Sequence, residues 1–191
     1  MKKTVLLLAA VLVMVSCNDR DKKAPAIDPA FTGYISGFTG GVISTHSDIT
    51  IQLVTDVPEQ VREGTDGQEL FTFKPSLKGS PVWKDSRTVE FRPSEAMAPG
   101  TRYECSFQLH NLLEVPAELR TFEFQFRTIL QSVQVEFGGL NSLDDEDMKW
   151  QQLQGSVITA DHADEQHVEE ILTATQNGRV LSIDWIHGAE G

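Results

Sequence analysis

Apolar and polar residues alternate with a period of two along much of residues 34–128. The clearest run is Phe122-Glu123-Phe124-Gln125-Phe126, which puts three phenylalanines on one side of an extended chain. This alternation is typical of strands with one buried face. It predicts seven strands, at residues 34–39, 49–55, 70–74, 80–84, 88–92, 102–109 and 120–128.

Turn-forming residues separate these segments, among them Gly40-Gly41, Lys78-Gly79 and Pro99-Gly100. About seven half-buried strands in about 100 residues, with no helical pattern between them, predict an Ig-like antiparallel β-sandwich over residues 28–129. The phase of the strands turns Phe122, Phe124, Phe126 and Cys105 inward.

The pattern changes after Thr128. It predicts a strand at 133–137, a strand at 149–159, a helix at 164–175 that stops at Asn177-Gly178, and a strand at 180–186. Three or four strands in about sixty residues leave edges open and an apolar face half covered. We therefore expect a second, partial β domain with one short helix over residues 131–191, truncated inside the domain.

The N-terminus has the pattern of a bacterial lipoprotein signal. Met1-Lys2-Lys3 is basic, residues 5–15 are apolar, and Met14-Val15-Ser16-Cys17 resembles a lipobox. The apolar run is too short to span a bilayer, which favours a cleaved signal over residues 1–17. We expect cleavage after Ser16, fatty acylation of Cys17, for example with palmitate, and a flexible tether over residues 18–29.

This interpretation places the protein in the bacterial cell envelope, anchored by lipid to the outer membrane or a periplasmic face. The alternatives are an ordinary signal peptide with a coincidental cysteine, and a cytosolic protein with an apolar start.

The charge excludes several functions. The chain carries 28 acidic and 16 basic residues, a net charge of −12, and losing Lys2 and Lys3 with the signal makes it −14. Such a chain repels nucleic acid and anionic lipid surfaces. With Cys17 committed to lipid, Cys105 has no disulfide partner, and its inward phase predicts an inert buried thiol.

The candidate chemistry is weak. The acidic run Asp144 to Asp147 lacks the spacing of a calcium loop, so a solvated loop is expected. His162 and His167 suggest a metal site, with Asp161, Asp164 and Glu165 nearby. On a helix, however, an offset of five residues turns the two rings about 140° apart, which favours surface residues.

Other residues give no stronger site. His46, His110 and His187 are isolated, and packing is the expected role of Trp83, Trp150 and Trp185, with sugar stacking as the alternative. No nucleophile elbow or Gly-rich phosphate loop is present. We therefore expect no enzyme, no catalytic residue, no cofactor and no metal.

One family resemblance goes beyond fold class. Its segments are residues 28–44, residues 73–79, residues 83–93, Pro99-Gly100-Thr101-Arg102-Tyr103, Phe124-Gln125-Phe126-Arg127-Thr128, and residues 155–161 with Ile183-Asp184-Trp185. In this order, after a lipoprotein start, they resemble the N-terminal end of the large lipoprotein alpha-2-macroglobulins of Gram-negative bacteria. The first domain also resembles bacterial Ig-like modules.

The resemblance implies part of an envelope inhibitor of endopeptidases that acts by entrapping proteases. The thioester of that family uses a Cys-x-Glu-Gln motif, whereas Cys105 is followed by Ser106-Phe107-Gln108. The resemblance therefore makes this chain the anchor and scaffold portion, with Cys17 as its site residue and with the membrane and, through the full-length protein, proteases as partners.

Two other functions stay open. The first is a free-standing Ig-like binding lipoprotein that recognises a glycan or an envelope protein. The second is a metal-dependent enzyme, which the histidine spacing disfavours. The reading frame beyond Gly191 distinguishes the first from the inhibitor.

Overall fold

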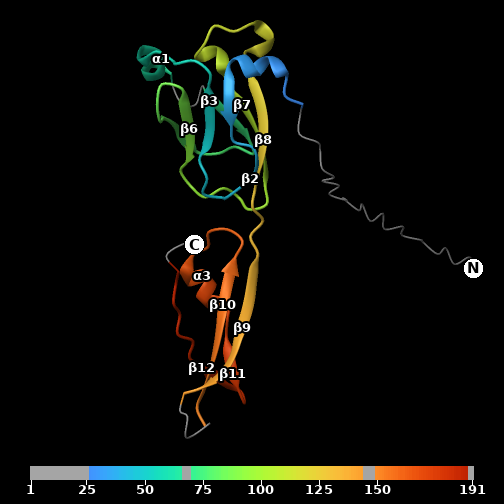
Figure 1. Ribbon diagram of the computed structural model, residues 1–191, viewed down its shortest axis with the longest axis vertical. Coiled ribbons are helices and arrows are strands. Elements are labelled where there is room, and N and C mark those ends of the chain that lie inside the picture. Colours follow the sequence, from blue (N-terminus) through green and yellow to red (C-terminus); the bar gives the residue numbers. More distant parts are fainter. Residues whose placement is uncertain (1–25, 66–69, 144–148, 189–191) are drawn as a thin grey trace, which may run out of the picture.

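Two β units follow one another along the long axis of the molecule (Figure 1). The structure, a computed structural model, describes residues 26–65, 70–143 and 149–188. Cys17 with its lipobox and the acidic run Asp144 to Asp147 lie outside the described residues.

The first unit is a sandwich of two four-stranded sheets. One sheet has the order β1 (Ile35–Phe38), β3 (Ile49–Leu53), β6 (Thr88–Pro93), β5 (Gly79–Trp83), all antiparallel. The other has the order β2 (Gly41–Ile43), β8 (Phe122–Thr128), β7 (Arg102–Phe107), β4 (Phe71–Lys74), in which β2 runs parallel to β8. These orders match the A-B-E-D and C-F-G sheets of the immunoglobulin fold, with β2 added beside the last strand. The predicted mostly-β fold with an Ig-like sandwich is confirmed.

The core forms because the alternating strands turn their apolar sides toward each other. In β7 and β8 the cross-strand pairs Tyr103↔Phe126, Cys105↔Phe124 and Phe107↔Phe122 all lie inward. Side chains from both sheets complete the core, including Ile49, Ile51, Leu53, Phe71, Phe73, Val89 and Phe91. The predicted inward phase of Cys105 and the three phenylalanines is therefore confirmed.

Two features of the sandwich differ from the sequence prediction. The first is β2, whose first residue, Gly41, belongs to the expected Gly40-Gly41 turn. Gly41 has φ +74° and lets the chain cross from one sheet to the other. Short helical elements also interrupt the strands. They are η1 (Pro29–Gly33), α1 (Glu59–Gly64), η2 (Leu109–Asn111) and η3 (Ala117–Leu119).

The second unit is built on a long antiparallel ribbon. β9 (Val133–Ser142) pairs with β10 (Gln151–Thr159) over their whole length, with a bulge at Gly138 between the pairs Phe137↔Gly155 and Gly139↔Gln154. The elements α3 (Glu165–Glu170), β11 (Ala174–Gln176) and β12 (Arg179–Leu181) follow.

The helix of this unit is shorter than predicted. Asp164 caps it, its carboxylate accepting from the His167 N–H at 3.0 Å, but the helix ends at Glu170. Asn177-Gly178, expected as its stop, is instead the two-residue turn of the β11–β12 hairpin, with φ of +50° and +78°. The strand predicted at 180–186 is formed only as far as Leu181.

Candidate functional site

The ribbon of the second unit has one apolar and one polar face. Cross-strand partners point to the same side of a sheet, so the pairs Val135↔Val157, Phe137↔Gly155 and Leu140↔Leu153 share a face, the bulge keeping Phe137 and Leu140 in phase. We call this side the ribbon face and define it by Val133, Val135, Phe137, Leu140, Leu153 and Val157. The opposite side carries Gln134, Glu136, Asn141, Gln152, Gln154, Ser156 and Ile158.

The ribbon face is open to solvent. The side chains of Phe137, Leu140 and Leu153 are 71%, 64% and 56% exposed. Among the described residues after Thr128 none is buried, so this unit has a ribbon with a patterned face but no closed core. Exposed apolar side chains that share one face make that face a candidate site for the packing of another polypeptide.

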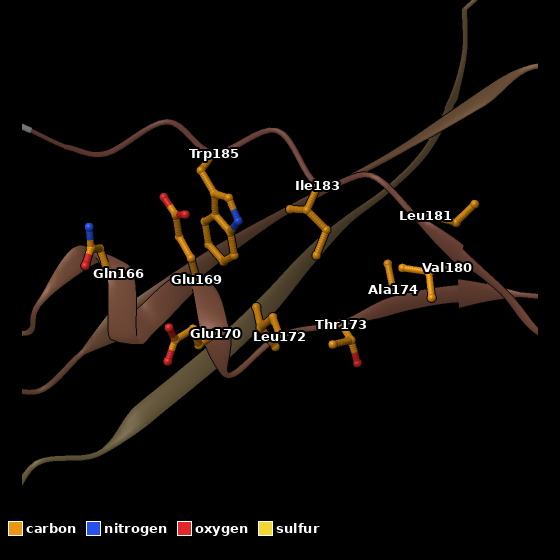
Figure 2. A pocket seen from close by; sticks show the side chains of 10 residues that line it. All are labelled: Gln166, Glu169, Glu170, Leu172, Thr173, Ala174, Val180, Leu181, Ile183 and Trp185. Atoms are coloured by element: carbon orange, nitrogen blue, oxygen red, sulfur yellow. The ribbon is translucent and has the colours of Figure 1, made fainter.

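A groove lies beside the ribbon, between α3, the β11–β12 hairpin and the segment that follows it. Its volume is about 520 Å³. Figure 2 shows Leu172, Ile183 and Trp185 grouped between these segments, with Glu169 and Glu170 on the α3 side. The Glu169 carboxylate lies 2.8 Å from His187 Nε2. The groove is thus lined by apolar side chains together with the carboxylates of Glu169 and Glu170.

Cys105 lies deep in the sandwich. Its side chain is 2% exposed, and burial raises the pKa of the thiol far above its ordinary value. The thiol therefore stays protonated at neutral pH and faces no solvent, so it is a packing residue.

The histidines and carboxylates around residue 162 do not converge on a metal. His167 lies with Asp164 at the start of α3, whereas the His162 ring packs against His46 with centroids 4.7 Å apart. From the sequence, we expected His46 to be isolated, and the structure shows that it contacts His162. Within the described ranges no group of three or more His, Cys, Asp or Glu side chains could hold a metal ion.

Asp161 makes a contact that the sequence did not predict. Its Oδ2 accepts the Thr45 N–H at 2.6 Å and the Thr45 hydroxyl at 2.8 Å, across 116 positions of sequence. Burial raises the pKa of this carboxyl and is the largest single influence. Hydrogen bonds from the Ser44 side chain, Thr45 and the His162 N–H outweigh it and lower the pKa to about 2. No local signal marks this pairing, because neither residue lies in a recognisable motif.

The three tryptophans have different surroundings. Trp83 packs against the sandwich core, with the Arg62 guanidinium 5.8 Å from its ring centroid. Trp185 is half-buried beside the groove, and Trp150 is exposed at the start of β10. Trp83 thus belongs to the sandwich, whereas Trp150 and Trp185 belong to the second unit.

Comparisons with known proteins give a distant likeness of fold alone. No protein-family model matches the chain, and no curated protein matches it. Similar solved structures include L,D-transpeptidase 3 from Mycobacterium tuberculosis (12% identity, TM-score 0.39) and an L,D-transpeptidase from Mycobacterium smegmatis (13% identity, TM-score 0.37). The match covers 55% of this chain, and 39% and 42% of those chains, so it spans about two fifths of their length.

The expectation that this chain is not an enzyme is contradicted by these neighbours, which are named as transpeptidases, and is withdrawn. At a TM-score below 0.5 the likeness carries no reaction over to this chain either. The resemblance to alpha-2-macroglobulins stays a prediction. Across the described residues, no helix combines the length and apolar character needed to cross a membrane.

Proposed function

We propose that this chain is the membrane-anchored scaffold segment of an alpha-2-macroglobulin-like protease inhibitor of the bacterial cell envelope. In this proposal the acylated Cys17 holds the chain on the membrane, and residues 18–29 lift the sandwich from it. The second unit then presents the ribbon face to further β-structured polypeptide of the inhibitor.

The observation that supports the proposal is the uncovered ribbon face. Phe137, Leu140 and Leu153 remain largely exposed, although their register places them on the one apolar side of a long ribbon. Covering a side chain of this size stabilises a structure by roughly 1.5–3 kcal/mol. Another sheet packed on this face therefore gains several such contributions at once, which is what a module inside a larger assembly needs.

The proposal is tested on membranes from the cells that make the protein, compared with membranes from a strain that lacks the gene. An entrapped protease is enclosed, so it should lose activity on a large substrate such as casein and keep activity on a small peptide. Membranes that contain the protein should therefore lower casein cleavage without lowering peptide cleavage, a result that we call the split. Membranes from the deletion strain should lower neither. Equal protease activity in the two preparations would contradict the proposed function.

Three variants connect the proposal to the ribbon face and to the anchor. Phe137→Ser removes an apolar group from the ribbon face and should abolish the split, whereas Gln134→Ser, on the opposite face of the same strand, should leave it unchanged. Cys17→Ala should move the protein from the membrane to the soluble fraction. A protein that is anchored through Cys17 but has no effect on proteases would instead favour the free-standing Ig-like binding lipoprotein.

A further inference from the structure

The connection between the two units is held on the side of the sandwich. The Ile129 N–H donates to the Ile43 carbonyl at 2.8 Å, and the Gly100 N–H donates to the Ile129 carbonyl at 3.0 Å. The Leu130 side chain lies against Gly100, where a Cβ would come within 2.8 Å of Leu130 Cδ1. The first half of the connection therefore belongs to the sandwich.

The second half of the connection is held by the second unit. The Gln131 side-chain amide accepts from the Asp161 N–H at 3.0 Å and donates to the carbonyls of Asp161 and His162 at 3.1 and 3.2 Å. The Ser132 carbonyl accepts the Ala160 N–H at 2.9 Å. The connection is therefore held at Ile129 by the sandwich and at Gln131 and Ser132 by the second unit, with the largely exposed Leu130 between them.

A second contact bridges the two units directly. Thr45, in the turn after β2, is only 6% exposed, and its carbonyl accepts the Met97 N–H at 2.9 Å, so it is fixed within the sandwich. Its N–H and hydroxyl both donate to Asp161 Oδ2, while the other oxygen of that carboxylate accepts the His162 N–H at 2.9 Å. An ionised carboxylate forms stronger hydrogen bonds than a neutral acceptor.

We propose that Thr45, Asp161 and Gln131 form a conformational latch that fixes the second unit in one orientation relative to the sandwich. The latch sets the direction in which the ribbon face points from the end of the sandwich. It is independent of the proposed function, because every contact in it lies within this chain. The ring contact of His46 with His162 lies beside the latch and joins the same two units.

The test is ¹⁵N relaxation of the whole chain with Cys17→Ala, which keeps it off membranes. If the latch holds, amides of residues 26–128 and of residues 133–188 share one rotational correlation time. With Asp161→Ala in addition, the smaller unit should tumble separately, with a correlation time lower by about twofold. A common correlation time in this variant would overturn the proposal.

Matched variants separate the latch from general damage to the second unit. Asp164→Ala removes an equal charge three residues away, at the α3 cap, and should leave a common correlation time; separation here would also count against the proposal. Loss of the cross-strand contacts would show that Asp161→Ala unfolds the ribbon. In that case the variants of Thr45, on the sandwich side of the latch, test the proposal instead. There Thr45→Val should loosen the junction partly, while Thr45→Ser, which keeps the hydroxyl, should not; equal behaviour of the two would overturn the proposal.

Discussion

At the scale of single residues, the phenylalanines of β8 contribute most clearly to stability. Phe122, Phe124 and Phe126 are each almost fully buried and pack against β7 and against one another. They alternate along the strand with Glu123, Gln125 and Arg127, whose side chains are more exposed. A substitution at one of these outward positions therefore serves as a control for a substitution in the core.

Truncating Phe124 should therefore destabilise the sandwich strongly. Phe124→Ala leaves a cavity in the core and should lower the free energy of unfolding by about 3–5 kcal/mol. Glu123→Ala, at the exposed adjacent position, should change it by less than about 0.5 kcal/mol. Urea denaturation followed by circular dichroism measures both, and similar effects of the two variants would mean that β8 is not packed as described.

Cys105 should make stability depend on alkaline pH. Burial raises the pKa of this thiol in the folded state, so the unfolded state alone ionises near the ordinary value of about 9. Stability is therefore fully present below that pH and is lost as the pH rises above it, by at most about 1.4 kcal/mol per unit.

The measurement compares the wild-type chain with Cys105→Ala by urea denaturation at pH 7 and pH 10. The cavity in the variant costs the same at both pH values, so only the difference between them reports the thiol. The advantage of the wild type should shrink at pH 10. An unchanged difference would show that the thiol reaches solvent in the folded state.

At the scale of elements, the close approach of β5 to β6 depends on a glycine. A Cβ at Gly79 would collide with the Arg92 carbonyl oxygen and would lie 2.8 Å from the Phe91 ring. The two strands can therefore pair at this edge only while residue 79 lacks a side chain.

Gly79→Ala should destabilise the sandwich by about 1–3 kcal/mol, because both strands must shift to accept the methyl group. Gly33→Ala is the control, since a Cβ there meets nothing within 4 Å. Thermal unfolding should show a lower midpoint for Gly79→Ala only. A midpoint equal to that of the control would mean that β5 moves away from β6 without cost.

The elements that the sequence predicts well are those with local alternation. β8 and β7 follow from the period-two pattern of Phe122 to Phe126 and Tyr103 to Phe107. β2 is three residues long and is stabilised by parallel pairing with a strand 85 positions away, so no local pattern marks it. α3 was predicted too long because Ile171 and Leu172 continue its apolar stripe. Residues 174–176 instead pair with residues 179–181 in the β11–β12 hairpin, and the helix ends before them.

At the scale of the whole molecule, the junction couples the two units through a single charged side chain. The hydrogen-bond donors around Asp161 come from the sandwich and from its own unit, and they lower its pKa to about 2. The sequence could not predict this pairing, because Thr45 and Asp161 are 116 positions apart and come together only when both units have folded. The exposure of the ribbon face, by contrast, was predicted in part, because the sequence pattern indicated a small sheet with a half-covered apolar face.

The depressed pKa predicts loss of the junction in acid. The stabilisation is present above the unfolded pKa of about 4, and it is lost as the pH falls through about 2. Small-angle scattering between pH 6 and pH 2 should show the wild type becoming less extended over this window, whereas Asp161→Asn should lack the transition. The same transition in both would assign it to other carboxyl groups.

The parallel pairing of β2 with β8 has a mechanical consequence. Both strands run toward the junction (Figure 1), so tension between the segment before η1 and the segment after β8 draws them past each other along their length. The pairs Gly41↔Phe126, Val42↔Arg127 and Ile43↔Thr128 then carry the load together, in shear. An antiparallel hairpin in this place would open one pair at a time under the same force. The sandwich is therefore arranged to resist extension when it is pulled by its two ends.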